Sequence, residues 1–213
     1  MHPELTDPEL TFSIEIFYTF VHMGRRNHPQ IELLRKQPSA FGGSLMTTRK
    51  GRLGSRPLGT RSTMHLVLRS SKAKAEWSFR QPKHAAKITE IATRFAVKNG
   101  VRILSLANVG NHLHFHIQLT NRFGYRPFIR AVTAAIAMAV TGACRSRPLK
   151  RTAKDRFWDY RPYTKVVNGL RAFLRLRDYV EINRWEGQGY SRERARLFLV
   201  EKEFIRRKFW STG

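Results

Sequence analysis

The stretch VRILSLANVGNHLHFHIQL, residues 101–119, contains two runs of alternating side chains separated by one glycine. Residues 101–109 and 111–119 are rich in residues that favour extended backbone, which predicts two strands. Gly110 suits the tight turn of a hairpin between them. In the second strand alternate residues point to opposite faces of the sheet. The two sets are His112, His114 and His116 on one face and Leu113, Phe115 and Ile117 on the other. We expect the apolar set to face the core and the imidazoles to lie on an open face.

The elements around this hairpin predict an α+β fold. Before it, residues 64–69 predict a strand and residues 82–98 a helix with apolar residues at spacings of three and four. After it, residues 127–141 predict an apolar helix, residues 162–167 a strand and residues 170–186 a further helix. The first six elements match the ferredoxin-like split βαβ pattern, in which two helices cover one face of an antiparallel sheet.

The chain of 213 residues divides into three predicted segments. Residues 1–62 are expected to be a poorly ordered extension, since the Gly-, Pro- and Arg-rich arm from 37 to 62 has few apolar side chains to offset the entropy of ordering. This arm is either a solvated linker or a segment that tracks a groove or phosphates. Residues 63–186 are the predicted domain. Residues 187–213 are an added basic helix, expected to turn Leu197, Val200 and Phe204 inward.

The charge of the chain points to a polyanionic partner. Lys and Arg number 40 against 15 Asp and Glu, a formal net charge of +25, and such a chain repels itself without a polyanion. Nucleic acid is the first candidate, ahead of an anionic membrane or a place in a ribosome. The single cysteine, Cys144, fits a reducing cytoplasm. The most apolar run, residues 131–140, is shorter than the ~20 residues that span a bilayer, so we expect no membrane segment.

Two groups of residues are candidates for chemistry. Two imidazoles spaced as in His112 and His114 can bind one divalent ion; the alternative is a polar strand face whose histidines bond to their neighbours. Tyr179 and Asn183 are four residues apart on a predicted helix, so they share one face about 5–6 Å apart. A phenol can act as a covalent nucleophile, and an amide oxygen can complete a metal's ligands. The alternative for Tyr179 is half-buried packing.

Together these groups resemble a known family. The stretch Val109-Gly110-Asn111-His112-Leu113-His114, followed by Asp178-Tyr179-Val180-Glu181-Ile182-Asn183, resembles the HUH single-tyrosine transposases, and most of all the REP-associated tyrosine transposases. Their pattern is His-hydrophobic-His on a central strand and a Tyr-x-x-x-(Asn or Gln) helix. The resemblance covers roughly residues 63–185, so residues 63–186 are predicted to be an HUH transposase-like catalytic domain. The departures are Gly110 in place of a common proline, the additional His116, and Arg184 in place of the proline after Asn183.

The resemblance implies a single-stranded DNA endonuclease and strand transferase. It assigns His112, His114 and Asn183 as ligands of Mg²⁺ or Mn²⁺, and Tyr179 as the nucleophile that leaves a 5′-phosphotyrosine. Relatives act at imperfect hairpins, so single-stranded or hairpin DNA is the expected partner. His116 could contact a metal-ligating residue, contact a phosphate, or be merely part of the polar face of the strand. A monomer is favoured over a dimer, in the cytoplasm and with the nucleoid if the source is a bacterium.

Basic and aromatic residues near these motifs are candidates for DNA contacts. Cations expected to hold phosphates are Arg69, Arg122, Arg126, Arg130, Lys165 and Arg171, and rings expected to stack on a base are Trp158 and Tyr160. The alternative for each is a solvated cation or a packed ring. Two other functions stay open. One is a catalytically degenerate nucleic-acid-binding protein, and the other a metal-dependent hydrolase that uses all three histidines.

Overall fold

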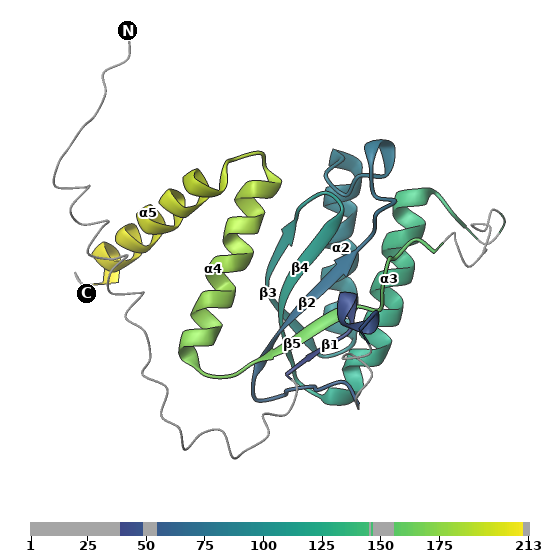
Figure 1. Cartoon of the computed structure of the whole chain (residues 1–213), viewed down its shortest axis with the longest axis horizontal. Coiled ribbons are helices and arrows are strands. Elements are labelled where there is room, and N and C mark those ends of the chain that lie inside the picture. The colour runs from purple at the N-terminus through teal and green to yellow at the C-terminus, as the bar shows by residue number, and fades with distance from the viewer. Residues whose placement is uncertain (1–38, 49–54, 145, 147–155, 211–213) are drawn as a thin grey trace, which may run out of the picture. The chain divides into compact units, whose positions relative to one another are not determined.

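The computed structural model describes residues 39–48, 55–144, 146 and 156–210, with only the backbone described for 205–210. Its sheet has five strands in the order β1-β5-β2-β4-β3, with every neighbouring pair antiparallel (Figure 1). The strands are β1 (Ala40–Phe41), β2 (Thr63–Arg69), β3 (Val101–Asn108), β4 (His112–Leu119) and β5 (Tyr163–Val167), and the long helices are α2 (Pro82–Lys98), α3 (Tyr125–Thr141), α4 (Leu170–Gly187) and α5 (Arg192–Trp210). The β5-β2-β4-β3 order is that of the split βαβ pattern, so the predicted fold class is confirmed.

The apolar alternates of the strands form the core with α2 and α3. On β4, Leu113, Phe115 and Ile117 are each 0% exposed, and they belong to one cluster with the buried residues of the two helices. Pro82 at the first position of α2 and Gly142 in the left-handed conformation after α3 mark helix ends that their residue types favour. The alternation in residues 111–119 therefore predicts the core face of the sheet correctly.

The predicted flexible arm differs from the structure in its described part. Ala40 and Phe41 form the edge strand β1 and pair with Lys165 and Thr164 of β5. Arg56 donates from Nη1 to the carbonyl oxygen of Pro162 at 2.8 Å and to Thr164 at 2.6 Å. These contacts with residues 162–165 order parts of the polar arm. Composition alone does not predict such long-range contacts. Residues 1–38 and 49–54 of the predicted extension lie outside the described residues, and the proposed domain limits stay a prediction.

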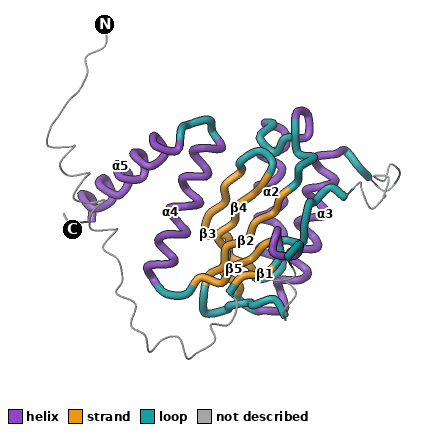
Figure 2. The backbone as a smooth tube through the Cα atoms, in the orientation of Figure 1, coloured by secondary structure: helices purple, strands orange, loops and turns teal. Residues whose placement is uncertain are grey.

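The face of the sheet that carries the histidines is covered, which corrects the prediction of an open face. Figure 2 shows the sheet between α4 on one side and α2 and α3 on the other. Leu176 and Val180 of α4 pack against Ala107 of β3 and Val167 of β5. At the end of α4, Gly187 approaches β3 so closely that a Cβ would lie 2.2 Å from the carbonyl oxygen of Asn108. After the short connection from β5 to Leu170, α4 therefore lies back across this face of the sheet.

The last helix packs on α4. Phe198 of α5 lies 4.9 Å from Trp185 between ring centroids, and Ala195 is 0% exposed. The predicted inward residues are wrong: Leu197, Val200 and Phe204 are 49%, 57% and 68% exposed. The spacing of these three residues does put them on one face of the helix. However, α5 packs on α4 through a different face, which carries its aromatic and ionic contacts. Within the described residues, no helix is both long and apolar enough to cross a membrane.

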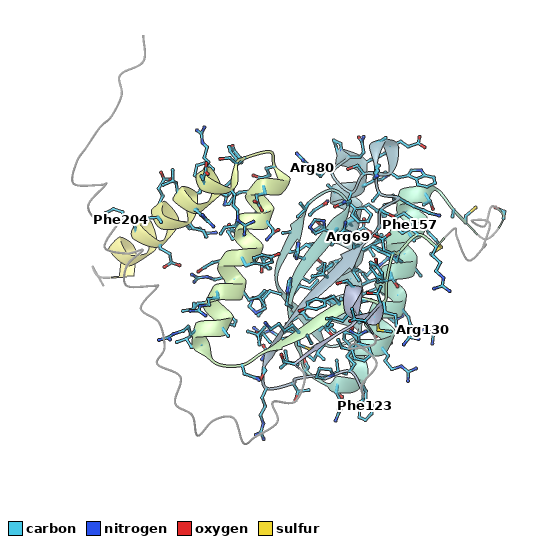
Figure 3. The ribbon with its side chains drawn as sticks, viewed as in Figure 1. Arg69, Arg80, Phe123, Arg130, Phe157 and Phe204 are labelled. Carbon is cyan, nitrogen blue, oxygen red and sulfur yellow. The ribbon has the colours of Figure 1, made fainter. Side chains whose placement is uncertain are left out.

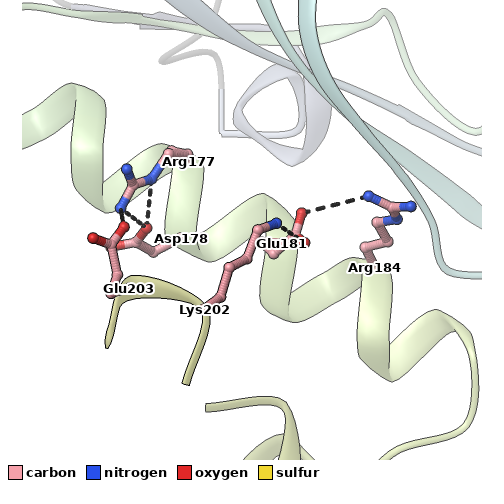
Figure 4. Close-up of polar contacts among 6 residues, drawn as sticks. All are labelled: Arg177, Asp178, Glu181, Arg184, Lys202 and Glu203. Carbon is pink, nitrogen blue, oxygen red and sulfur yellow. Dashed lines mark hydrogen bonds and ion pairs between the residues drawn. The ribbon is translucent and has the colours of Figure 1, made fainter. Parts of the chain in front are cut away.

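Ion pairs join α4 and α5 (Figure 4), and their α4 partners Arg177 and Glu181 are both two residues from Tyr179 in the sequence. Arg177 contacts Glu203 at 2.7 Å and Asp178 at 2.8 Å. Glu181 accepts from Lys202 at 2.8 Å. The charged face of α5 is thus used in part to hold the helix that carries the predicted nucleophile.

Candidate active site

A row of polar side chains crosses the face of the sheet under α4. The pairing of β2 with β4 places His65 opposite His116, Val67 opposite His114 and Arg69 opposite His112. His65 Nε2 lies 3.0 Å from His114 Nδ1, and the two rings stack with centroids 5.3 Å apart. His65 is one site residue that sequence reasoning missed. Its alternation with Met64 and Leu66 indicates the non-core face, but only the strand register shows that it meets His114.

In His112 and His114 the hydrogen bonds use Nδ1, so Nε2 of each ring is available to bind a ligand. His112 Nδ1 lies 2.6 Å from the side-chain oxygen of Asn111, and His114 Nδ1 faces His65. His114 is 5% exposed, and its Nε2 is buried without a hydrogen-bond partner in the described part of the chain. Buried polar atoms without partners are uncommon. This nitrogen is therefore a candidate ligand atom.

The site keeps these imidazoles neutral. Burial, aided by the neighbouring His65 and His112, lowers the pKa of His114 to about 3. Burial, aided by His116 and Lys165, lowers the pKa of His65 to about 4. Burial and the charge of Arg69 also lower the pKa of His112. A neutral imidazole is the form that ligates a metal.

Tyr179 reaches the histidine face from α4. Its ring centroid lies 5.4 Å from that of His114 and 5.6 Å from that of His65, edge-on to both. Tyr179 is 37% exposed, so its ring contacts both imidazoles and is also reached by solvent. Asn183 lies one turn further along α4 and is 6% exposed. Its Nδ2 donates to the carbonyl oxygen of Tyr179 at 2.7 Å, which links the two residues.

These rings open into a pocket of about 680 Å³. His65, His114 and Tyr179 line it together with further aromatic and basic side chains. The tyrosines are Tyr160 and Tyr163, and the cations are Arg69, Arg161, Lys165 and Arg175. The predicted contacts Arg69, Tyr160 and Lys165 thus border the pocket, whereas Arg161 and Arg175 were missed, because their loop and helix positions depend on tertiary packing. His112 and Asn183 are not among the lining residues.

Other predicted contacts lie elsewhere. Trp158 packs against the core and donates from Nε1 to the carbonyl oxygen of Thr133 at 3.0 Å, which favours the alternative of a packed ring over the predicted stacking on a base. Arg126 and Arg130 are exposed on α3, and Arg122 lies in the turn before it, all in the helical layer on the opposite side of the sheet. Arg171 is exposed in the first turn of α4, outside the pocket lining.

His116 differs from the other two histidines of β4. It is 1% exposed and packs against Phe173 of α4, with ring centroids 4.8 Å apart. That burial is incompatible with the predicted contact to a phosphate in this conformation. Among the described residues, no group of three His, Cys, Asp or Glu side chains is arranged to hold a metal ion. The geometry therefore does not favour a hydrolase site built from the three histidines.

Comparisons with known proteins give structural neighbours only. No protein-family model and no curated protein matches the sequence. The chain is similar to the structure of a REP-associated tyrosine transposase bound to a REP hairpin, with 11% identity, coverage of 62% of this chain and 72% of that chain, and a TM-score of 0.48. It is also similar to a candidate transposase from Deinococcus radiodurans, with 16% identity, coverage of 61% and 96%, and a TM-score of 0.38. The first neighbour belongs to the family that the two sequence motifs resemble. The identities and TM-scores are too low to assign a function to this chain.

Proposed function

We propose that the protein cleaves and rejoins single-stranded DNA, with Tyr179 as the nucleophile. The observation that carries this proposal is the meeting of Tyr179 from α4 with His114 and His65 from the sheet, in a pocket bordered by four cations. A phenol beside neutral imidazoles and cations suits attack on a phosphodiester more than the chemistry of a neutral substrate. The net charge of +25 supports a nucleic-acid substrate.

The residue types of His112, His114 and Asn183 support a divalent metal ion as the cofactor. His112 and His114 each engage Nδ1 with a neighbour, an arrangement that orients ligating imidazoles and leaves Nε2 for the metal. We propose that these two atoms and the amide of Asn183 hold Mg²⁺ or Mn²⁺. When bound, the ion would supply positive charge that stabilises the phosphate oxygens in the transition state. To ligate through its oxygen, Asn183 can keep the hydrogen bond that its Nδ2 donates to Tyr179.

The chain's own residues supply attack and positioning. Tyr179 Oη attacks the scissile phosphorus, the bond from phosphorus to the 3′-oxygen breaks, the phenol loses its proton and the 3′-oxygen gains one. The products are a 5′-phosphotyrosine and a free 3′-hydroxyl, which can attack in the reverse sense to rejoin a strand. Arg161, Lys165 and Arg175 line the pocket, which supports a role for them in holding flanking phosphates, and the exposed ring of Tyr160 supports a role in stacking on a base.

A cleavage assay with paired histidine variants tests this proposal. Hairpin-bearing single-stranded DNA from the flanks of the gene is incubated with the protein and Mg²⁺ or Mn²⁺, and the products are separated under denaturing conditions. We expect nicking with a covalent adduct, loss of both on adding EDTA, and loss of both in His114→Ala. His116→Ala is the matched control, because His116 lies outside the pocket lining. Equal loss in the two variants would contradict the metal assignment.

A second function is favoured by one observation. Asn183 is nearly buried, bonds to the backbone of its own helix and does not line the pocket. A protein that lost cleavage but kept binding would show this arrangement without a metal. Such a protein would leave every strand intact in this assay, and in a separate binding titration it would bind the DNA with strong salt dependence.

We also propose that the active unit is a monomer, because the pocket and Tyr179 come from one chain. Mixing Tyr179→Phe with His114→Ala tests this point. A monomeric site predicts no recovery of cleavage in the mixture, whereas a dimer that exchanges α4 would restore it.

A further inference from the structure

A second basic surface lies at one end of the helical layer. The end of α2 and the start of α3 meet there, since Gly124 is so close to Asn99 that a Cβ would lie 2.0 Å from its carbonyl oxygen. Thr120 N also donates to the carbonyl oxygen of Gly100 at 2.9 Å. These contacts hold two chain segments of distant sequence against each other.

An aromatic ring projects from this end. Phe123 is 81% exposed, and its backbone N–H donates to the side-chain oxygen of Asn121 at 2.9 Å. Figure 3 labels Phe123 at the lower end of α3, with its side chain pointing away from the sheet. Val97 of α2 is 77% exposed at the same end. A large ring held in water by an anchored turn has no role in the core.

Cations lie at the same end of the helical layer, at the end of α2 and on both sides of Phe123 in the sequence. We define the α2–α3 end patch as Val97, Lys98, Arg122, Phe123 and Arg126, all of which are exposed. Within the described part of the chain no carboxylate forms an ion pair with the three cations Lys98, Arg122 and Arg126. The positive end of the α3 dipole adds to their field. Such a surface attracts an anion with a flat apolar part.

We propose that the α2–α3 end patch binds single-stranded nucleic acid, with Phe123 stacked on an unpaired base and the cations on neighbouring phosphates. Sequence-tolerant single-strand sites combine these two elements. The patch is separate from the pocket, but it shares an end of the sheet with the start of α4. The register shows this, because Thr63 pairs with both Gln118 of β4 and Val167 of β5. A strand that leaves the pocket past Asn168 at this end runs toward the patch. Binding at the patch does not require cleavage by Tyr179.

Fluorescence anisotropy with a labelled single-stranded oligonucleotide tests the stacking role. The full chain is used in EDTA, so that metal-dependent cleavage does not interfere. Phe123→Ala should weaken binding about 5- to 150-fold, the range for loss of one stacked base. The matched control is Phe204→Ala, because Phe204 is 68% exposed on α5 and lies outside the patch. Thermal unfolding of both variants should match the wild type, because both side chains are solvent-exposed.

The phosphate contacts are tested by salt dependence. Arg122→Gln and Arg126→Gln should each lower the slope of log affinity against log salt by about 0.7 for a lost single-strand phosphate. Arg196→Gln, an exposed arginine of α5, is the control and should leave the slope unchanged. A duplex of the same length should bind Phe123→Ala as it binds the wild type, because paired bases do not offer a free face.

Three results would overturn the inference. They are equal affinity of Phe123→Ala and Phe204→Ala for the oligonucleotide, equal weakening on duplex and single strand, and a Phe123-dependent affinity for phosphatidylserine vesicles with none for the oligonucleotide. A protein that binds through Phe123 yet never nicks DNA would uphold this inference and contradict the proposed function alone.

Discussion

Acidification from pH 7 to pH 5 should lower the free energy of unfolding of the metal-free protein by about 2–4 kcal/mol. His65 and His114 carry the effect, because their folded pKa values are about 4 and about 3 against 6.5 for an unperturbed histidine. At pH 5 both are therefore neutral in the folded state and protonated in the unfolded state. Each contributes about 1.4 kcal/mol per pH unit below 6.5, or about 2 kcal/mol at pH 5.

The sign follows from proton uptake. The unfolded chain binds more protons below pH 6.5, so stability is complete above that pH and is lost as the pH falls toward the folded pKa values. Urea unfolding in EDTA at pH 8, 7, 6 and 5 measures this, and the interval from pH 8 to 7 is the internal reference, with little change expected. His65→Gln removes one titrating ring and should reduce the loss between pH 7 and pH 5 by about 2 kcal/mol. An unchanged loss in His65→Gln, or a flat wild-type profile, would refute the reasoning.

Three further predictions concern the elements that hold the site. Gly187→Ala places a Cβ 2.2 Å from the carbonyl oxygen of Asn108, so α4 must shift, and the free energy of unfolding should fall by about 1–3 kcal/mol in chemical denaturation. The exposed Gln188→Ala is the control and should not lower it. Equal stability of the two variants would show that α4 does not need the close contact between Gly187 and Asn108. Glu203→Gln breaks a partly exposed ion pair with Arg177, so thermal unfolding should show a loss below about 1 kcal/mol that disappears in high salt; a loss insensitive to salt would argue against an ionic contact. Trp158→Phe removes the hydrogen bond to Thr133, so the free energy of unfolding should fall by about 0.5–1.5 kcal/mol while the DNA affinity is kept. Tyr160→Ala should weaken DNA binding in anisotropy assays without a loss of stability. The reverse pattern would show that Trp158 is the stacking ring.

The sequence predicts the central part of this fold well. Alternation in residues 111–119 separates Phe115 from His114 correctly, because an extended strand alternates its side chains whatever its neighbours are. The order of strands and helices then leaves few antiparallel arrangements, and the split βαβ order is the one observed. These features depend on local periodicity and short connections.

The remaining features depend on partners that are distant in the chain. The register between β2 and β4 puts His65 opposite His116 and makes His114 its diagonal neighbour. No local sequence pattern predicts that register. β1 exists because β5 offers a free edge to a segment of low apolar content. Phe204 is exposed because α5 uses its aromatic and ionic contacts with α4, which outweigh the spacing of its aliphatic residues. Arg126 likewise lies on α3, on the other side of the sheet from the pocket. The basic sequence around Arg126 does not show this separation.

The central claim is that Tyr179 becomes bonded to DNA. The most direct measurement is mass spectrometry of the adduct formed with hairpin-bearing single-stranded DNA, Mn²⁺ and the wild-type protein, after digestion to peptides. The account predicts a nucleotide on the peptide that contains Tyr179, no adduct with Tyr179→Phe, and a retained adduct with Tyr163→Phe, a tyrosine that lines the same pocket. An adduct that survives Tyr179→Phe, or one mapped to another residue, would contradict it.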